Sequence, residues 1–306
     1  MEQLLQAMER QLHGQAYNIR LLATALVAGG HVLLEGVPGL GKTKMARTLA
    51  SLIGGDYRRI QFTPDLMPSD MTGSIIYHMQ MSEFQTVKGP VFTNILLADE
   101  INRSGPKTQA ALLEAMEERQ VTIQGTTYKL PNPFFVIATQ NPVEYEGTYP
   151  LPEAQLDRFM FKLVLNYPDE ASERSLLKAH ANTPLQEEQL VQPLLSIDTI
   201  LSAQRQLANV IVEDSIIDYI AAIVRLTRES RSVQLGASPR AGIAILMASK
   251  AWALLDGRTY VTPDDVKLVA RPALRHRLLL SAQAELEGGT SDGIIQETLA
   301  AAPVPR

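Results

Sequence analysis

Short apolar runs alternate with helical patterns through the first half of the chain. Each run ends where polar residues or glycine begin, and the five runs cover residues 31–35, 57–62, 95–98, 134–138 and 161–165. Near-continuous apolar strands of this kind are typical of a parallel sheet that is buried on both faces. The alternation of strands with helices therefore predicts an α/β fold in which helices cover a sheet.

Two segments interrupt this alternation. Residues 71–92 contain two glycines and Pro90 among aromatic residues, and they indicate an insertion rather than one helix. Residues 120–130 alternate about a turn centred on Gly125, which is the pattern of a β-hairpin. For both segments the alternative is an ordinary surface loop.

The strand-like patterns end near Pro168, and helical patterns follow. Residues 169–180 predict one helix, and apolar side chains recur at helical spacing from Glu213 onward. Another helix is expected from Pro239 to Leu255. In Thr262-Pro263-Asp264-Asp265 the threonine can cap a helix, the proline fits its first turn, and the acids suit its positive end. These features predict an all-helical second domain.

We therefore expect an α/β domain over residues 1–167 and a helical domain over residues 168–306. A chain of 306 residues is long enough for two such domains. The tail after Gly288 is rich in glycine, alanine and proline, and we expect it to fray.

Composition and charge exclude several classes of protein. The net charge of −5 excludes a global basic field that would hold nucleic acid. The chain has no cysteine, which excludes disulfides, thiolate catalysis and cysteine-ligated zinc. No run approaches the roughly 20 apolar residues that span a bilayer, and the acidic start is unlike a secretory signal. We expect a soluble, cytoplasmic protein without membrane insertion.

The clearest chemical motif is Gly36-Val37-Pro38-Gly39-Leu40-Gly41-Lys42-Thr43, which matches the phosphate-binding pattern G-x-x-x-x-G-K-[ST]. Glycines let backbone amides surround phosphate oxygens, and the helix that follows adds its unsatisfied N–H groups. Lys42 would neutralise charge on the terminal phosphates of ATP, and the Thr43 hydroxyl would bind Mg²⁺. The alternative is a glycine-rich turn with an incidental lysine. We expect the nucleotide contacts to come from Gly36, Val37, Pro38, Gly39, Leu40, Gly41, Lys42, Thr43 and Lys44.

A phosphate loop needs a carboxylate partner at the end of another strand, and residues 95–100 provide one. Four apolar residues lead into Asp99 and Glu100. Asp99 would hold Mg²⁺ through its water shell, and Glu100 would act as general base on the attacking water. The alternative is a solvated strand end.

Further motifs occur in a definite order. They are Gly29–Gly36 before the phosphate loop, Asp99–Arg103, Gln109–Met116, Ala138–Pro142, Leu151–Phe159 and Ser238–Ala241. In this order they closely resemble the MoxR family of AAA+ ATPases. The resemblance spans roughly residues 12–280, which is nearly the whole chain.

The resemblance implies an AAA+ core with a five-stranded parallel sheet, a helical lid, and assembly into a ring that is usually hexameric. It identifies residues 71–92 as an insertion within the second helix and residues 119–131 as a hairpin before the sensor strand.

The resemblance also implies roles for three polar residues. Asn141 matches the first sensor, which contacts the γ-phosphate or the attacking water, although Asn-Pro after a strand is otherwise a common turn. Arg158 matches the arginine finger that reaches the γ-phosphate of a neighbouring subunit; the alternative is a surface arginine paired with Asp157 or Glu153. Arg240 matches the second sensor, acting within or between subunits, with an exposed arginine as the alternative.

Arg271, Arg275, His276 and Arg277 form a small basic cluster on what the pattern predicts to be the last lid helix. We interpret it as a solvated face or a subunit contact, with a site for an acidic partner as the alternative.

The leading hypothesis is a ring-forming, Mg²⁺-dependent ATPase that remodels or matures a client complex. The resemblance implies a partner with a von Willebrand A domain, on a separate chain. A nucleic-acid-dependent motor is the alternative, although the net charge and a single basic residue in the 120–130 hairpin, Lys129, argue against it. A scaffold that binds but does not hydrolyse ATP is a third possibility, against which the Asp99-Glu100 pair argues.

Overall fold

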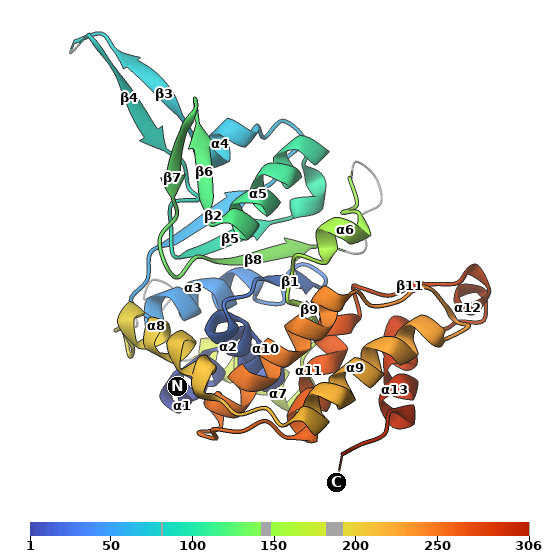
Figure 1. Ribbon diagram of the computed structural model, residues 1–306. Helices are drawn as coiled ribbons and strands as arrows, with labels where there is room; N and C mark the ends of the chain where they lie inside the picture. The colour runs from blue at the N-terminus through green and yellow to red at the C-terminus, as the bar shows by residue number, and fades with distance from the viewer. Residues whose placement is uncertain (81, 142–147, 182–191, 306) are drawn as a thin grey trace.

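A five-stranded parallel sheet lies at the centre of the first part of the chain (Figure 1). The computed structural model describes residues 1–80, 82–141, 148–181 and 192–305. The strand order is β2-β5-β8-β1-β9, and every neighbouring pair is parallel. The strands are β1 (Val32–Glu35), β2 (Tyr57–Gln61), β5 (Ile95–Asp99), β8 (Phe135–Gln140) and β9 (Phe161–Val164). The predicted α/β fold is confirmed.

Successive residues of these strands point to opposite faces of the sheet, because the side-chain period of a strand is two. In β5, Ile95 and Leu97 join one hydrophobic cluster, whereas Leu96 and Ala98 join the other. Helices α2 (Ala16–Ala28) and α3 (Lys42–Leu52) cover the first face, together with α1 (Glu2–Gln11). Helix α5 (Pro106–Glu118) covers the second. The near-continuous apolar pattern of the strands follows from burial on both sides.

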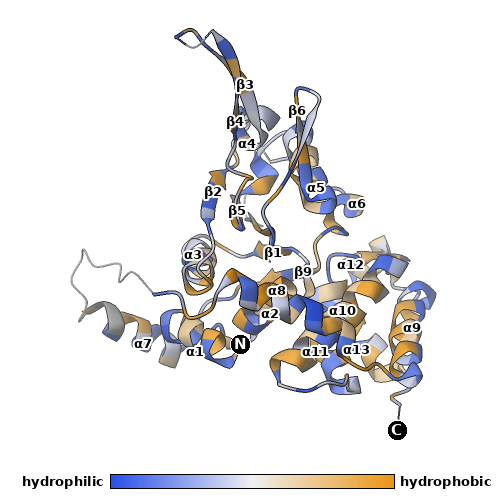
Figure 2. Ribbon diagram, turned by 60° about the vertical axis from the view of Figure 1, so that its left-hand side comes forward, coloured by the Kyte–Doolittle hydropathy of each residue, from blue (hydrophilic) through white to orange (hydrophobic). Residues whose placement is uncertain are grey.

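Both segments that interrupt the alternation form antiparallel hairpins, so the surface-loop alternative is wrong for each. After the short helix α4 (Pro68–Thr72), the first hairpin pairs β3 (Gly73–His78) with β4 (Glu83–Lys88) and projects from the body (Figure 1). The second pairs β6 (Gln120–Ile123) with β7 (Thr126–Lys129). Figure 2 shows apolar stretches on the projecting hairpin as well as on the helices below the sheet.

The remainder of the described chain is mostly helical and contains the lid. Its helices are α7 (Glu170–Ala181), α8 (Ile197–Gln206), α9 (Asp214–Glu229), α10 (Pro239–Leu255), α11 (Pro263–Leu274), α12 (Ala282–Leu286) and α13 (Ser291–Ala301). Helices α10 and α11 begin where the sequence predicts. The lid is not entirely helical, because β10 (Val233–Leu235) pairs with β11 (Leu279–Leu280). None of the described helices combines the length and apolarity needed to cross a membrane.

The expectation that the tail frays is wrong. Residues 291–301 form α13, which Thr290 caps by accepting a hydrogen bond from the N–H of Gly293 at 3.1 Å. Ile294 and Ile295 are buried in the main hydrophobic cluster. Two adjacent apolar side chains outweigh the glycine and alanine content, because tertiary packing overrides weak local propensity.

One hydrophobic cluster connects the sheet to the lid. It contains Leu34 of β1 and Leu22 of α2, and it continues to Ile223 of α9 and Ile245 of α10. Helix α2 packs between the sheet and α10, which explains why every residue from Leu21 to Val27 is buried. The two parts of the chain therefore share one core.

Candidate active site

The turn between β1 and α3 has the conformation of a phosphate loop. Gly39 and Gly41 have φ values of +87° and +78°, which favour glycine. A Cβ atom on Gly36 would lie 2.8 Å from the carbonyl oxygen of Leu165, so a larger residue does not fit there. No atom would lie within 4 Å of a Cβ on Gly39, so that side of the turn is open.

Lys42 lies at the same end of the parallel strands as Asp99 and Glu100. The Lys42 ammonium donates hydrogen bonds to the carbonyl oxygens of Gly36 and, at 3.4 Å, of Gln140. Burial lowers the pKa of Lys42, and the negative charges of Asp99, Glu100 and Glu35 oppose that shift. These acids act on Lys42 because the carboxyl ends of parallel strands meet at one edge of the sheet.

Asp99 is the last residue of β5, and both oxygens of its carboxylate accept hydrogen bonds. Thr139 Oγ1 donates a hydrogen bond of 2.6 Å to Oδ1. Arg59, on β2, donates from Nε at 3.0 Å and from Nη2 at 2.7 Å to Oδ2. The same Thr139 hydroxyl accepts the N–H of Glu100 at 2.9 Å. Thr139 therefore fixes the two acids relative to β8.

Glu100 follows with φ +57°, a left-handed conformation that is uncommon outside glycine and that turns the chain sharply after β5. Its carboxylate accepts a hydrogen bond of 2.9 Å from Gln61 Nε2 and lies 3.0 Å from Arg103 Nε. The side chain is 29% exposed, so solvent water can reach it.

Asn141 follows β8 directly and is buried. Because β8 lies between β1 and β5, Asn141 sits between the phosphate loop and the acid pair along the sheet edge. Pro142, the next residue of the motif, lies outside the described residues. Thr43 and Lys44 form the exposed first turn of α3.

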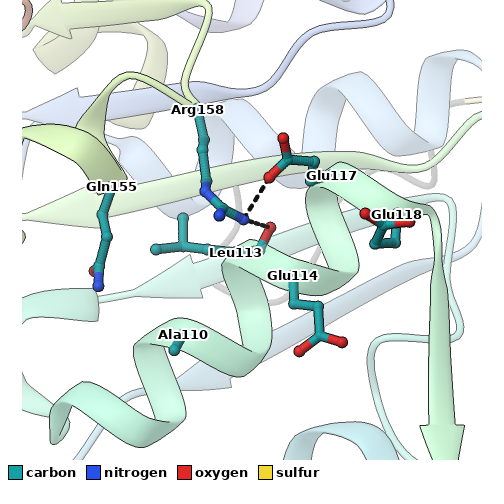
Figure 3. A pocket seen from close by; sticks show the side chains of 7 residues that line it. All are labelled: Ala110, Leu113, Glu114, Glu117, Glu118, Gln155 and Arg158. Atoms are coloured by element: carbon teal, nitrogen blue, oxygen red, sulfur yellow. Dashed lines mark hydrogen bonds and ion pairs between the residues drawn. The ribbon is translucent and has the colours of Figure 1, made fainter.

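Arg158 and Arg240 share one carboxylate partner, Glu117 of α5. Arg158 follows the short helix α6 (Glu153–Leu156); its Nη1 lies 2.7 Å from Glu117 Oε2 and donates 2.9 Å to the carbonyl oxygen of Leu113 (Figure 3). Arg240, at the start of α10, places Nη2 2.5 Å from Glu117 Oε1. The alternative pairing of Arg158 with Asp157 or Glu153 is therefore wrong, because α5 supplies the carboxylate.

The basic cluster 271–277 is a solvated face only at Arg271, which is exposed; its other three members are largely buried. Arg277 is 3% exposed at its side chain and lies 2.5 Å from Asp157 Oδ1, and Arg275 lies 2.8 Å from Asp292. His276 is buried with Nε2 2.9 Å from the carbonyl oxygen of Phe159, and burial lowers its pKa well below the usual value. The cluster connects the lid to the core, and two further helices follow it.

Sequence reasoning missed the partners of the acids and of the two arginines. Arg59 and Gln61 alternate on β2, so their side chains point to one face and reach Asp99 and Glu100 respectively. The period of two and the shared sheet edge could have identified this pair. Glu117 had no comparable signal.

The residues at this edge fit a nucleotide with Mg²⁺. Open backbone amides in a glycine turn and a helix N-terminus suit phosphate oxygens. The Thr43 hydroxyl and the Asp99 carboxylate are oxygen donors, the kind that Mg²⁺ prefers. Close to the turn, Leu12 and Gly14 border a hollow of about 320 Å³ beside α7.

Comparisons with known proteins point to one family of ATPases. The model of the ATPase family associated with various cellular activities (AAA) matches residues 31–161, and an AAA lid domain matches residues 225–298. The chain is 53% identical to the uncharacterized protein YeaC of Bacillus subtilis, over 93% of this chain and 88% of the other.

Two further relatives cover the full length of the chain. Chaperone MoxR1 of Mycobacterium tuberculosis is 43% identical over 100% of this chain and 82% of its own. The crystal structure of a proposed ATPase from Cytophaga hutchinsonii is 44% identical, covers 100% of this chain and 94% of its own, and superposes with a TM-score of 0.92. From these matches and the geometry of the sheet edge, the chain belongs to the MoxR family of AAA+ ATPases.

Proposed function

We propose that the chain hydrolyses ATP to ADP and phosphate with Mg²⁺, as a subunit of a chaperone-like ring. The observation that carries the proposal is the sheet edge at which Lys42 contacts both the phosphate loop and β8 while Thr139 of β8 holds Asp99 and Glu100. The glycine-rich turn and the carboxylate pair are thus both tied by hydrogen bonds to β8.

Each residue has a distinct role in the proposed reaction. The amides of residues 36–44 bind the phosphates, and Lys42 neutralises their charge. Thr43 and Asp99 would hold the Mg²⁺, which supplies charge neutralisation at the transferred group. Glu100 accepts the proton of the attacking water, and Asn141 orients that water or the γ-phosphate.

Arg158 and Arg240 are proposed to act on the ATP of a neighbouring subunit. Support comes from their partners: among the described residues, both contact Glu117 and neither contacts Lys42, Asp99 or Glu100. Their side chains are 32% and 46% exposed, which leaves them accessible to a second copy. A ring, usually hexameric in this family, would supply that copy.

The lid is proposed to transmit hydrolysis to the client. Because sheet and lid share one hydrophobic cluster, the motion is a sliding of packed helices rather than a free hinge. The family resemblance supports a partner with a von Willebrand A domain, and Chaperone MoxR1 supports a chaperone-like role. The cytoplasmic location stays a prediction.

The test combines three variants in ATP-binding and phosphate-release assays. Glu100→Gln is expected to bind ATP with nearly unchanged Kd and to lose at least about 100-fold in kcat, since it removes the general base. Arg158→Ala is expected to lower kcat about 10³-fold, because an arginine finger contributes a factor of that size to kcat.

Mixing distinguishes action between subunits. Arg158→Ala subunits keep an intact nucleotide site, and Lys42→Ala subunits still supply Arg158, so a mixture should regain part of the activity. Full activity of a monomer at high dilution would contradict the ring mechanism. Stimulation by DNA with steep salt dependence would favour the nucleic-acid motor instead.

A further inference from the structure

Glu117 has no role in the reaction described above, yet it contacts both arginines that are proposed to act between subunits. It lies in the last turn of α5, at the edge of a pocket of about 270 Å³ (Figure 3). Oε2 lies 2.7 Å from Nη1 of Arg158, which comes from the core. Oε1 lies 2.5 Å from Nη2 of Arg240, which comes from the lid. One carboxylate thus joins two guanidinium groups from opposite parts of the chain.

The shared carboxylate solves an electrostatic problem. Two guanidinium groups near each other repel, and they do so more strongly in a partly shielded site than in water. A single carboxylate that gives one oxygen to each group offsets the repulsion and leaves the trio with a net positive charge. The hydrogen bond from Arg240 holds the pKa of Glu117 below its usual range, so the carboxylate stays charged in this arrangement.

The backbones that carry the two arginines are also fixed to each other. Arg277 donates to the carbonyl oxygens of Asp157 at 2.9 Å, Phe159 at 2.8 Å and Met160 at 3.1 Å, and so encloses the turn that holds Arg158. Ser238, two residues before Arg240, donates 3.1 Å to the Asp157 carboxylate. With the main chains anchored, Glu117 sets where the two side chains point.

Both guanidinium groups keep donors for a further anion. Each carries five N–H donors. Among the described residues, the contacts of Arg158 involve Nη1 and those of Arg240 involve Nη2. The remaining N–H groups can bind the oxygens of a phosphate while Glu117 stays bound.

We propose that Glu117 is a positioning residue that holds Arg158 and Arg240 as a preformed pair of cations for the terminal phosphates of ATP on a neighbouring copy of this chain. The inference rests on the proposed action of these arginines between subunits. Preorganised charge of this kind accelerates a reaction because no reorganisation is needed when the transition state forms.

The experiment measures kcat and KM for ATP at ring-forming protein concentration, together with the Kd of a fluorescent ATP analogue. Glu117→Ala is expected to lower kcat about 10-fold or more, with KM and Kd within about threefold, because Glu117 does not touch the nucleotide of its own subunit. Glu117→Gln, which has the same shape but a single carbonyl oxygen as acceptor, is expected to lie between Glu117→Ala and wild type. The matched control is Glu114→Gln on the same helix, where the carboxylate points away from Arg158 and the rate should stay unchanged (Figure 3).

A mutant cycle separates positioning from general stability. If Glu117 acts through the two arginines, adding Glu117→Ala to a variant that already carries Arg158→Ala and Arg240→Ala slows the reaction by no more than about twofold. Multiplicative losses would overturn the inference. An unchanged or faster Glu117→Ala would also overturn it, the faster rate showing that Glu117 restrains the arginines instead of presenting them.

The two proposals fail in different ways. If Arg158→Ala is fully active, or if mixing with Lys42→Ala restores nothing, action between subunits fails and the inference fails with it. If Arg158→Ala and the mixture behave as expected while Glu117→Ala keeps its rate, only the role of Glu117 is lost. Glu117→Gln keeps the side-chain volume, so the comparison remains valid if Glu117→Ala folds poorly.

Discussion

His31 lies just before β1 and is bound through both ring nitrogens. Nδ1 accepts the N–H of Val136 at 3.0 Å, and Nε2 lies 3.2 Å from the carbonyl oxygen of Met116. This pair of partners requires a neutral ring with its proton on Nε2. Burial lowers the pKa of His31 to about 4. The neutral form is therefore part of the folded structure.

Acid should weaken the fold through this residue. In the unfolded chain His31 takes up a proton below about pH 6.5, whereas in the folded chain it does so only near pH 4. Stability is fully present above pH 6.5 and falls by about 1.4 kcal/mol per pH unit down to about pH 4, or about 2 kcal/mol at pH 5. Urea unfolding at pH 7 and pH 5 measures the loss.

The comparison variant is His31→Gln, which can keep a donor and an acceptor but does not titrate. Its free energy of unfolding should fall less between pH 7 and pH 5 than that of wild type, while the buried His276 adds a loss of the same sign to both proteins. Equal losses in the two proteins would show that His31 is not the titrating group.

Residues of the site differ in how far the sequence predicts them. The phosphate loop and the acid pair are continuous motifs, so their residue types and spacing identify them locally. Arg59 reaches Asp99 only after β2 pairs with β5. Glu117 reaches Arg240 across 123 positions, and no local pattern encodes that contact. Motifs reveal what each segment can bind, and folding decides which segments meet.

At the scale of elements, helix α11 shows how one acid organises a helix start. Asp265 accepts hydrogen bonds of 2.8 Å from both the N–H and the hydroxyl of Thr262. Arg258 donates to its two oxygens at 2.7 and 2.6 Å. The Asp265 side chain is only 3% exposed, so its charge depends on these partners.

Neutralising this acid should destabilise the lid. Asp265→Asn is expected to lower the free energy of unfolding by about 3 kcal/mol, since it breaks a largely buried ion pair and one side of the capping box. The matched control is Asp264→Asn, one position earlier, where the side chain is 83% exposed and a change below about 0.5 kcal/mol is expected. Chemical denaturation checks both, and similar losses would contradict the argument.

Helices and strands with a clear pattern of apolar positions or a clear cap could be predicted from the sequence. Elements too short to show such a pattern could not. The β5 run is buried on both faces, and α10 starts at a capped Ser238-Pro239, so each has a clear signal. Strands β10 and β11 have three and two residues, too few for a period to show. The glycine and alanine content of α13 predicts fraying, whereas its buried Ile294-Ile295 pair holds the helix in place.

At the scale of the whole molecule, the shared core makes sheet and lid interdependent. Helix α2 lies against both the sheet and α10, so removing the lid would expose its apolar side. Exposed apolar patches of this kind cause aggregation. The division at residue 167, drawn from sequence patterns, does not mark a gap in the packing.

A fragment of residues 1–167 is therefore expected to aggregate or to lack a cooperative melt, whereas the full chain should unfold in a single main transition. Size-exclusion chromatography and thermal denaturation followed by circular dichroism compare the two. A monomeric fragment that melts cooperatively would show that the sheet does not depend on the lid.

The two hairpins are joined near their bases, since Thr86 of β4 and Tyr128 of β7 lie within hydrogen-bonding distance at 3.1 Å. Lys88 also lies over the rings of Phe92 and Tyr128. With six residues per strand at about 3.3 Å each, the β3–β4 hairpin is roughly 20 Å long. Strand β6 follows α5 directly, so a force on the tip of the β3–β4 hairpin has a continuous path through the contact between the hairpins to the turn of α5 that carries Glu117.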